Sequence, residues 1–143
     1  MFEIRVDRID RIVEFTLSGV VQLAEMQSFV SQLEAATLSL GGRDIRVKAD
    51  VRALGPASPA VADMIRDVQA FGIRWGVKRV AEIVESDIVA LQLNRVAKES
   101  GTDRILRRFW DDDSARDWLL QPESEEPPAS RGAPSSSRPP RPR

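Results

Sequence analysis

The sequence contains no histidine, no cysteine and no tyrosine among its 143 residues. Without histidine or cysteine, the chain cannot form a Ser-His-Asp triad, a thiolate nucleophile, a zinc finger or an iron–sulfur site built on cysteine. Disulfide bonds are excluded as well, which fits a reducing compartment. Any catalytic chemistry would therefore depend on carboxylates, hydroxyls, arginines and the three lysines.

The chain also lacks an excess of charge of one sign and any long apolar run. The 21 basic and 22 acidic residues give a net charge of -1, which argues against a protein that coats nucleic acid. No apolar run approaches the ~20 residues of a membrane-spanning helix, and the first residues lack the apolar core of a secretory signal. We expect a cytoplasmic protein without a transmembrane segment.

Large apolar residues are missing from the end of the chain. Residues 121–143 contain seven of the nine prolines and no Ile, Leu, Val, Phe or Trp. Such a segment cannot bury enough apolar surface to offset the entropy of ordering it. We therefore expect a folded domain over 1–120 and a disordered tail over 121–143. The closing RPPRPR would be either a docking peptide or a solubilising extension.

The first 120 residues alternate between strand and helix patterns. Period-two alternation predicts strands from Phe2 to Val6, near 13–17, over 45–51, near 78–84 and from Arg104 to Trp110. Apolar residues at helical spacing begin at Leu23 and after Ser58-Pro59, Ser86-Asp87 and Asp111-Asp112-Asp113. Serine, proline and acidic residues are typical of helix starts. The predicted order is β-β-α-β-α-β-α-β-α.

This order predicts an α/β fold with a mixed, mostly parallel five-stranded sheet that begins with an antiparallel hairpin. The strands alternate apolar and charged residues, whereas strands covered on both faces are apolar throughout. We therefore expect the helices to cover mainly one face. The opposite, solvated face would carry Glu3, Arg5, Glu14, Arg46 and Lys48.

Three segments carry a family resemblance: Ala49-Asp50-Val51-Arg52, Lys78 to Val84, and Phe109 followed by Asp113 to Leu120. They resemble the SpoIIAA-like branch of the STAS fold, also described as STAS/SEC14-like. The resemblance implies a bacterial regulatory or scaffold protein without enzymatic activity. It also implies partner contacts at the loop after the third strand and at the start of the second helix. The implied contact residues are Asp50, Arg52, Ser58 and Ala60.

In that family a serine at the start of the second helix is phosphorylated. The corresponding position falls nearest Ala60 here, and Ser58 lies two residues earlier. Ser58 is therefore the candidate phosphorylation site, and its alternative role is that of a helix cap. A phosphate would be accommodated electrostatically at a helix N-terminus.

Other candidate sites have a structural alternative. Asp111, Asp112 and Asp113 could bind Mg²⁺ or Ca²⁺, but acidic residues also favour a helix N-terminus, and we expect no metal. There is no glycine-rich phosphate loop, and we expect no cofactor. A set of basic residues would either contact phosphates or form a solvated face paired with acids: Arg74, Lys78, Arg79, Arg95, Lys98, Arg104, Arg107 and Arg108. The net charge favours the second interpretation, so we expect no specific nucleic-acid binding.

Two functional hypotheses follow. The first is a protein-interaction module, which binds a protein partner through the Asp50–Ser58 loop or forms a homodimer through the sheet. The second is a carrier of a small molecule, either a nucleotide or a lipid, at the carboxyl ends of the strands. The apolar stripes of the helices predict a dry core with little spare volume for a lipid tail.

Overall fold

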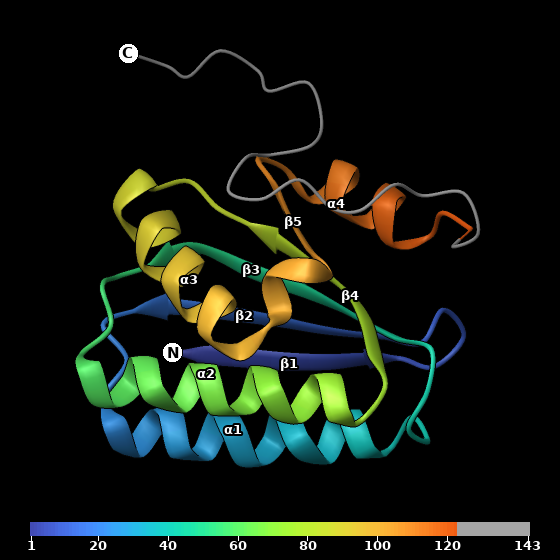
Figure 1. Cartoon of the computed structure of the whole chain (residues 1–143), viewed down its shortest axis with the longest axis horizontal. Helices are drawn as coiled ribbons and strands as arrows, with labels where there is room; N and C mark the ends of the chain where they lie inside the picture. Colours follow the sequence, from blue (N-terminus) through green and yellow to red (C-terminus); the bar gives the residue numbers. More distant parts are fainter. Residues whose placement is uncertain (123–143) are drawn as a thin grey trace.

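The computed structural model describes residues 1–122 and contains a single five-stranded sheet in the order β1-β2-β3-β4-β5. β1 pairs with β2 in antiparallel orientation, and the remaining pairs are parallel. Figure 1 shows the sheet crossing the molecule between its helices. The predicted fold class is confirmed. The predicted tail begins at 121, so almost all of it lies outside the described residues.

The element order is also the predicted one. The strands are β1 (Phe2–Asp7), β2 (Ile12–Gly19), β3 (Ile45–Leu54), β4 (Val77–Ile83) and β5 (Leu106–Phe109), and the helices are α1 (Leu23–Leu38), α2 (Pro59–Arg74), α3 (Asp87–Ser100) and α4 (Asp112–Leu119). The fifth strand is shorter than predicted because Thr102–Arg104 form a 3₁₀ turn before it. None of the helices within 1–122 is long and apolar enough to cross a membrane.

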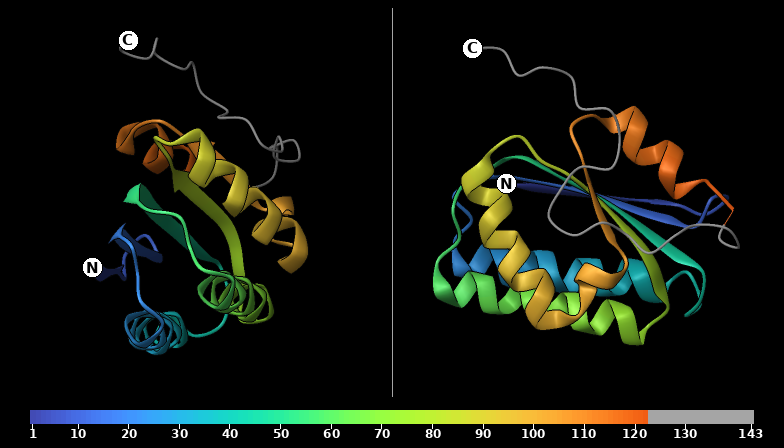
Figure 2. Two further views of the ribbon diagram at one scale, coloured as in Figure 1. Left: turned by 90° about the vertical axis from the view of Figure 1, so that its left-hand side faces the viewer. Right: turned by 45° about the horizontal axis from the view of Figure 1, so that its top comes forward.

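Three helices pack against one face of the sheet, as predicted. The main core lies between α1, α2, α3 and this face, and it includes Val47 and Val51 of β3 together with Phe29 and Leu93 of the helices. Figure 2 shows α1 and α2 on this side of the sheet. The alternating residues of β3 explain this placement, since every second side chain points toward the helices.

α4 covers part of the opposite face. Trp118 and Leu119 pack with Ile12, Ile83 and Phe109 in a second, smaller core. Figure 2 shows α4 on the other side of the sheet from α1 and α2. The expectation that Lys48 lies on a solvated face is therefore wrong, because Lys48 is only 8% exposed beneath α4. An eight-residue helix was enough to change the environment of the central strand.

The helix starts follow the predicted capping residues. Ser58, Ser86 and Asp111 each accept a hydrogen bond from the backbone N–H three residues later. This satisfies one of the N–H groups that the first turn of a helix leaves unpaired. Local side-chain chemistry therefore determines where α2, α3 and α4 begin.

Gly76 connects α2 to β4 at a point where only glycine fits. Its φ angle is +100°, and a Cβ atom there would lie 2.3 Å from the carbonyl oxygen of Gly42. The Gly76 carbonyl also accepts a hydrogen bond from the Ile45 N–H at the start of β3. Close contact between these two loops thus fixes the ends of the sheet where β3 and β4 begin, opposite the ends that carry the predicted site.

Candidate functional site

Asp50 and Arg52 form a salt bridge on the face of the sheet that carries α4. Arg52 Nε lies 3.0 Å from Asp50 Oδ1, and Arg52 Nη2 lies 2.7 Å from Asp50 Oδ2. These hydrogen bonds from Arg52 lower the pKa of Asp50 below its usual value, although burial opposes the shift. The two residues satisfy each other, so their charges are already paired.

Ser58 and Ala60 lie at the start of α2, and both are exposed. The Ser58 hydroxyl accepts a hydrogen bond from the Val61 N–H at 3.3 Å and acts as the helix cap. The preceding loop is held by Gln92 of α3, which bonds both the N–H and the carbonyl of Ala57 at 2.9 and 2.7 Å. The four predicted residues therefore fall into two groups: Asp50 and Arg52 bond each other on β3, and Ser58 and Ala60 lie apart from them at the start of α2.

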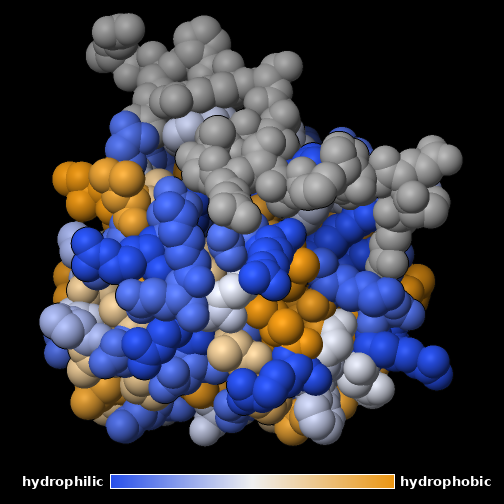
Figure 3. Space-filling model, viewed as in Figure 1, coloured by the Kyte–Doolittle hydropathy of each residue, from blue (hydrophilic) through white to orange (hydrophobic). Residues whose placement is uncertain are grey.

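Exposed apolar side chains lie next to this loop. Ile88 and Leu91 occupy one side of the first turns of α3 and are 70% and 69% exposed. Figure 3 shows apolar surface at the upper left, over the start of α3. Gln92 joins this part of α3 to the loop before Ser58. The apolar side chains thus extend the predicted contact surface from α2 to α3.

A polar pocket of about 190 Å³ lies on the other face, lined by Asp50 together with Glu14, Lys48 and Asp112. Lys48 Nζ lies 2.6 Å from both Glu14 Oε1 and Asp112 Oδ1. Burial lowers the pKa of Lys48, but these two hydrogen-bonded carboxylates raise it above the ordinary value overall. The lysine stays charged and connects β3 to β2 and to α4.

Two residues of the acidic run make structural contacts. Asp111 Oδ1 accepts a hydrogen bond from the Ser114 N–H at 2.8 Å, and Asp112 binds Lys48. Within residues 1–122, no group of three or more Asp and Glu side chains is placed to hold a metal ion. Of these carboxylates, Asp111 therefore caps helix α4 and Asp112 neutralises Lys48.

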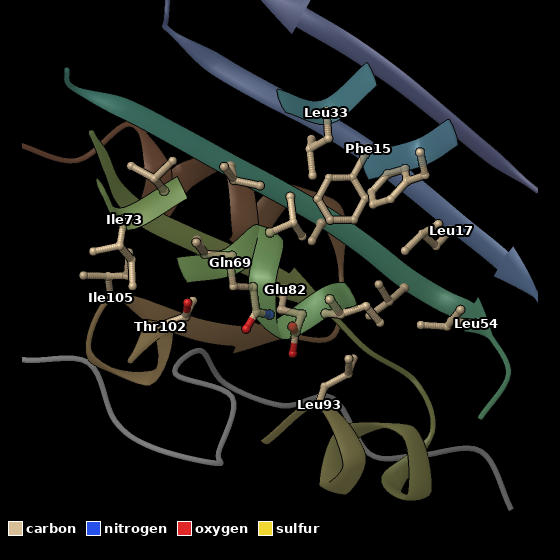
Figure 4. Close-up of a pocket in the computed structure, with 18 residues that line it drawn as sticks. Phe15, Leu17, Leu33, Leu54, Gln69, Ile73, Glu82, Leu93, Thr102 and Ile105 are labelled. Carbon is tan, nitrogen blue, oxygen red and sulfur yellow. The ribbon is translucent and has the colours of Figure 1, made fainter. Parts of the chain in front are cut away.

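A second hollow lies inside the main core, between the sheet and helices α1, α2 and α3. Its volume is about 80 Å³, and it is not fully enclosed. The lining is almost entirely apolar and includes Phe15, Phe29, Val47, Ala49, Leu93 and Ile105. Figure 4 shows three exceptions, Gln69 of α2, Glu82 of β4 and Thr102 of the 3₁₀ turn, with their polar ends among apolar side chains. We refer to this space as the core cavity.

Glu82 is held in the core cavity by a buried ion pair. Arg108 Nε of the neighbouring strand lies 2.7 Å from Glu82 Oε1, and Arg108 Nη1 donates a hydrogen bond to Asn94 Oδ1 of α3. Burial raises the pKa of Glu82 above its ordinary value overall, although the guanidinium beside it opposes that rise. Among the described residues, Arg108 Nη2 is buried without a hydrogen-bond partner. The core thus carries a charged pair where apolar residues would pack more simply.

The sequence did not reveal this cavity or this pair. Arg108 was grouped with seven other basic residues as a surface set, yet Arg108 and Arg79 are 2% and 6% exposed. Arg79 Nη1 donates instead to the Trp118 and Gln121 carbonyls at the end of α4. The local pattern does not separate Arg108 from the other basic residues, because its burial depends on contacts with Glu82 of β4 and Asn94 of α3.

The comparisons with known proteins support the fold. No family model matches the chain, and no curated protein matches it either. Among solved structures, an uncharacterized protein of the DUF3478 family with a SpoIIAA-like fold, from Shewanella loihica PV-4, superposes with a TM-score of 0.65. The two chains are 23% identical, and the match covers 83% of this chain and 92% of the other. The predicted SpoIIAA-like fold is thereby confirmed.

Proposed function

We propose that this protein is a non-enzymatic binding module that holds a small, mainly apolar molecule in the core cavity. The observation that carries the proposal is the buried Glu82 carboxylate in the lining of a largely apolar space of about 80 Å³. An unfilled apolar space of this size costs about 2 kcal/mol of stability. A ligand that fills the space would recover that free energy.

The ion pair adds to this argument. Removing two charges from water carries a desolvation cost that their attraction does not always repay, so a buried pair is weak evidence of a purely stabilising role. Here the pair also places one carboxylate in the lining of the cavity. A polar group at a fixed position in an apolar pocket is typical of small-molecule sites, where it orients the ligand.

The test compares two variants of one strand. Ala49 lines the cavity and is 3% exposed, whereas Ala53 is an exposed residue of the same strand. Full-length protein from its native host is analysed by native mass spectrometry, and a library of small apolar fragments is screened by NMR. We expect Ala49→Leu to abolish binding and Ala53→Leu to retain it. Equal binding by both variants, or none by the native protein in either assay, would contradict the proposal.

A second candidate function is the protein-interaction module suggested by the resemblance. The observation in its favour is the exposure of Ile88 and Leu91 beside the loop that leads to Ser58. The matching partner surface would be an apolar ridge that fits against these two side chains. Such a partner would act through the region of Ser58 and Ala60, as the family resemblance implies.

This candidate is tested by capture from the native host, with full-length chain and a 1–120 truncation in parallel. Ile88→Ser with Leu91→Ser should abolish capture of a partner, and Lys98→Ser, at an exposed position of the same helix, should not. A partner lost only on truncation would move recognition to the tail. Retention of the chain as a dimer, disrupted by the double variant, would identify a second copy as the occupant.

A further inference from the structure

We infer that the ligand of the core cavity is electrically neutral and presents a hydroxyl group, or another group that both donates and accepts a hydrogen bond, to Glu82 and Gln69. The inference rests on the proposed function of the cavity as a small-molecule site. It specifies the chemical class of the ligand from the charges and hydrogen-bond groups that line the space.

The charge of the site is already balanced. Glu82 and Arg108 carry opposite charges 2.7 Å apart, and their side chains are 4% and 2% exposed. An anionic ligand would place a second negative charge beside the Glu82 carboxylate. A cationic ligand would leave a net positive charge in the core together with Arg108. Since an uncompensated buried charge is costly, both kinds of ion are disfavoured and a neutral molecule is favoured.

The hydrogen-bond groups of the lining are complementary to each other. Among the described residues, Glu82 Oε1 accepts the hydrogen bond from Arg108, which leaves Oε2 as an acceptor in the cavity lining. Gln69 uses its Oε1 to accept from the Ser100 hydroxyl at 2.8 Å, which leaves its Nε2 as a donor. A ligand hydroxyl donates to the first and accepts from the second, because a hydroxyl has both capacities.

The volume limits the part of the ligand that is enclosed. A cavity of ~150 Å³ holds benzene, with its six carbon atoms. By this standard, about 80 Å³ accommodates a group of roughly three or four non-hydrogen atoms. Because the cavity is not fully enclosed, a longer ligand could place only one end in it. The enclosed end would carry the hydroxyl and a short apolar chain.

The test uses three probes of the same chain length: 1-propanol, propionate and propylammonium. Each is titrated into full-length protein while the backbone amide signals of Ala49 and Leu93 are followed by NMR. We expect 1-propanol to shift these signals with a Kd at least tenfold lower than that of either ion. Ala49→Leu, which fills the cavity, should abolish the shifts, and this controls for general effects of alcohol.

Gln69→Leu separates the polar group from the cavity. This variant retains side-chain bulk but removes the donor, and Gln69 is only partly buried on α2, so we expect it to fold. It should reduce the preference for 1-propanol over the two ions. The remaining shifts should still be abolished when Ala49→Leu is added, because the cavity is then filled. Binding of propionate or propylammonium as tight as that of 1-propanol would overturn the assignment of a neutral ligand but leave the cavity as a binding site. Absence of shifts with all three probes would overturn the assignment and count against the proposed function as well.

Discussion

Glu82 and Arg108 lie directly opposite each other on β4 and β5, and their side chains form the most deeply buried ion pair in the described part of the chain. Both side chains are on the face of the sheet that packs against α1, α2 and α3. The pair joins the last two strands and, through Asn94, also α3. It therefore connects the edge of the sheet to the helix that borders the core cavity.

Removing one member of this pair should be much worse than removing both. Glu82→Leu or Arg108→Met alone leaves an uncompensated buried charge, so each should lower the free energy of unfolding by about 3–5 kcal/mol. The double variant replaces the pair by apolar side chains and should lose much less than the sum. Urea unfolding of the four proteins gives the coupling energy. If the losses of unfolding free energy in the two single variants add up to the loss in the double variant, the two side chains do not stabilise each other.

The order of elements was predictable because it depends on local patterns. Alternation along 45–51 and the caps at Ser58, Ser86 and Asp111 are all visible within a few residues of sequence. The hairpin and the three helices on one face follow from the same patterns together with the rules of chain connection. The sequence therefore supported the SpoIIAA-like fold well.

The site was less predictable because its contacts join residues far apart in the chain. Glu82 and Arg108 are 26 residues apart, and Lys48 and Asp112 are 64 apart. Alternation marks Lys48 as a surface residue, and nothing nearby indicates that α4 will cover it. An empty space is harder still to predict, because it depends on how the side chains of the sheet and three helices fit together.

Gly76 should tolerate no side chain. In Gly76→Ala the new Cβ would lie 2.3 Å from the Gly42 oxygen, and φ is +100°, so the loops must separate. We expect the free energy of unfolding to fall by about 3 kcal/mol or more, well above the ~1 kcal/mol typical of a point variant. Thermal unfolding measures the loss.

Gly41→Ala is the matched control for this effect. Gly41 also has a positive φ, at +81°, but nothing lies within 4 Å of the position of its Cβ. It should therefore show only the cost of backbone strain, about 1 kcal/mol. Equal losses in the two variants would mean that strain, and not the contact with Gly42, explains the glycine at 76.

Asp50 should contribute to stability at neutral pH and lose that contribution in acid. Arg52 lowers the pKa of Asp50 in the folded state below the value in the unfolded chain. The stabilisation is therefore complete above the unfolded-state pKa and disappears as the pH falls through the folded-state pKa. Because the pair is partly exposed, Asp50→Asn should cost no more than about 1 kcal/mol at neutral pH.

Denaturant unfolding at a series of pH values tests this expectation. The curves for the native protein and Asp50→Asn should converge as the pH falls. Asp117→Asn, at an exposed position of α4, makes the same chemical change away from Arg52 and is the control. A stability difference that persists in acid would indicate that Asp50 acts through something other than its charge.

Ser58 has two candidate roles that can be separated by substitution. As the cap of α2, its hydroxyl accepts from the Val61 N–H, so Ser58→Ala should cost about 1 kcal/mol of unfolding free energy. Asparagine and aspartate are both good caps, and negative charge is favourable at a helix N-terminus. Ser58→Asn and Ser58→Asp should therefore stay close to the native stability in thermal unfolding.

The same three variants test control by phosphorylation. Ser58 is exposed at the end of a loop fixed by Gln92, so a phosphate there would add charge at the proposed partner surface without disturbing the core. If the charge regulates a partner, Ser58→Asp should change partner capture, whereas Ser58→Asn, an equally good but neutral cap, should behave like the native protein. Identical capture by Asp and Asn variants would restrict Ser58 to the structural role. The contrast depends only on charge, because both variants cap the helix and both are matched in size.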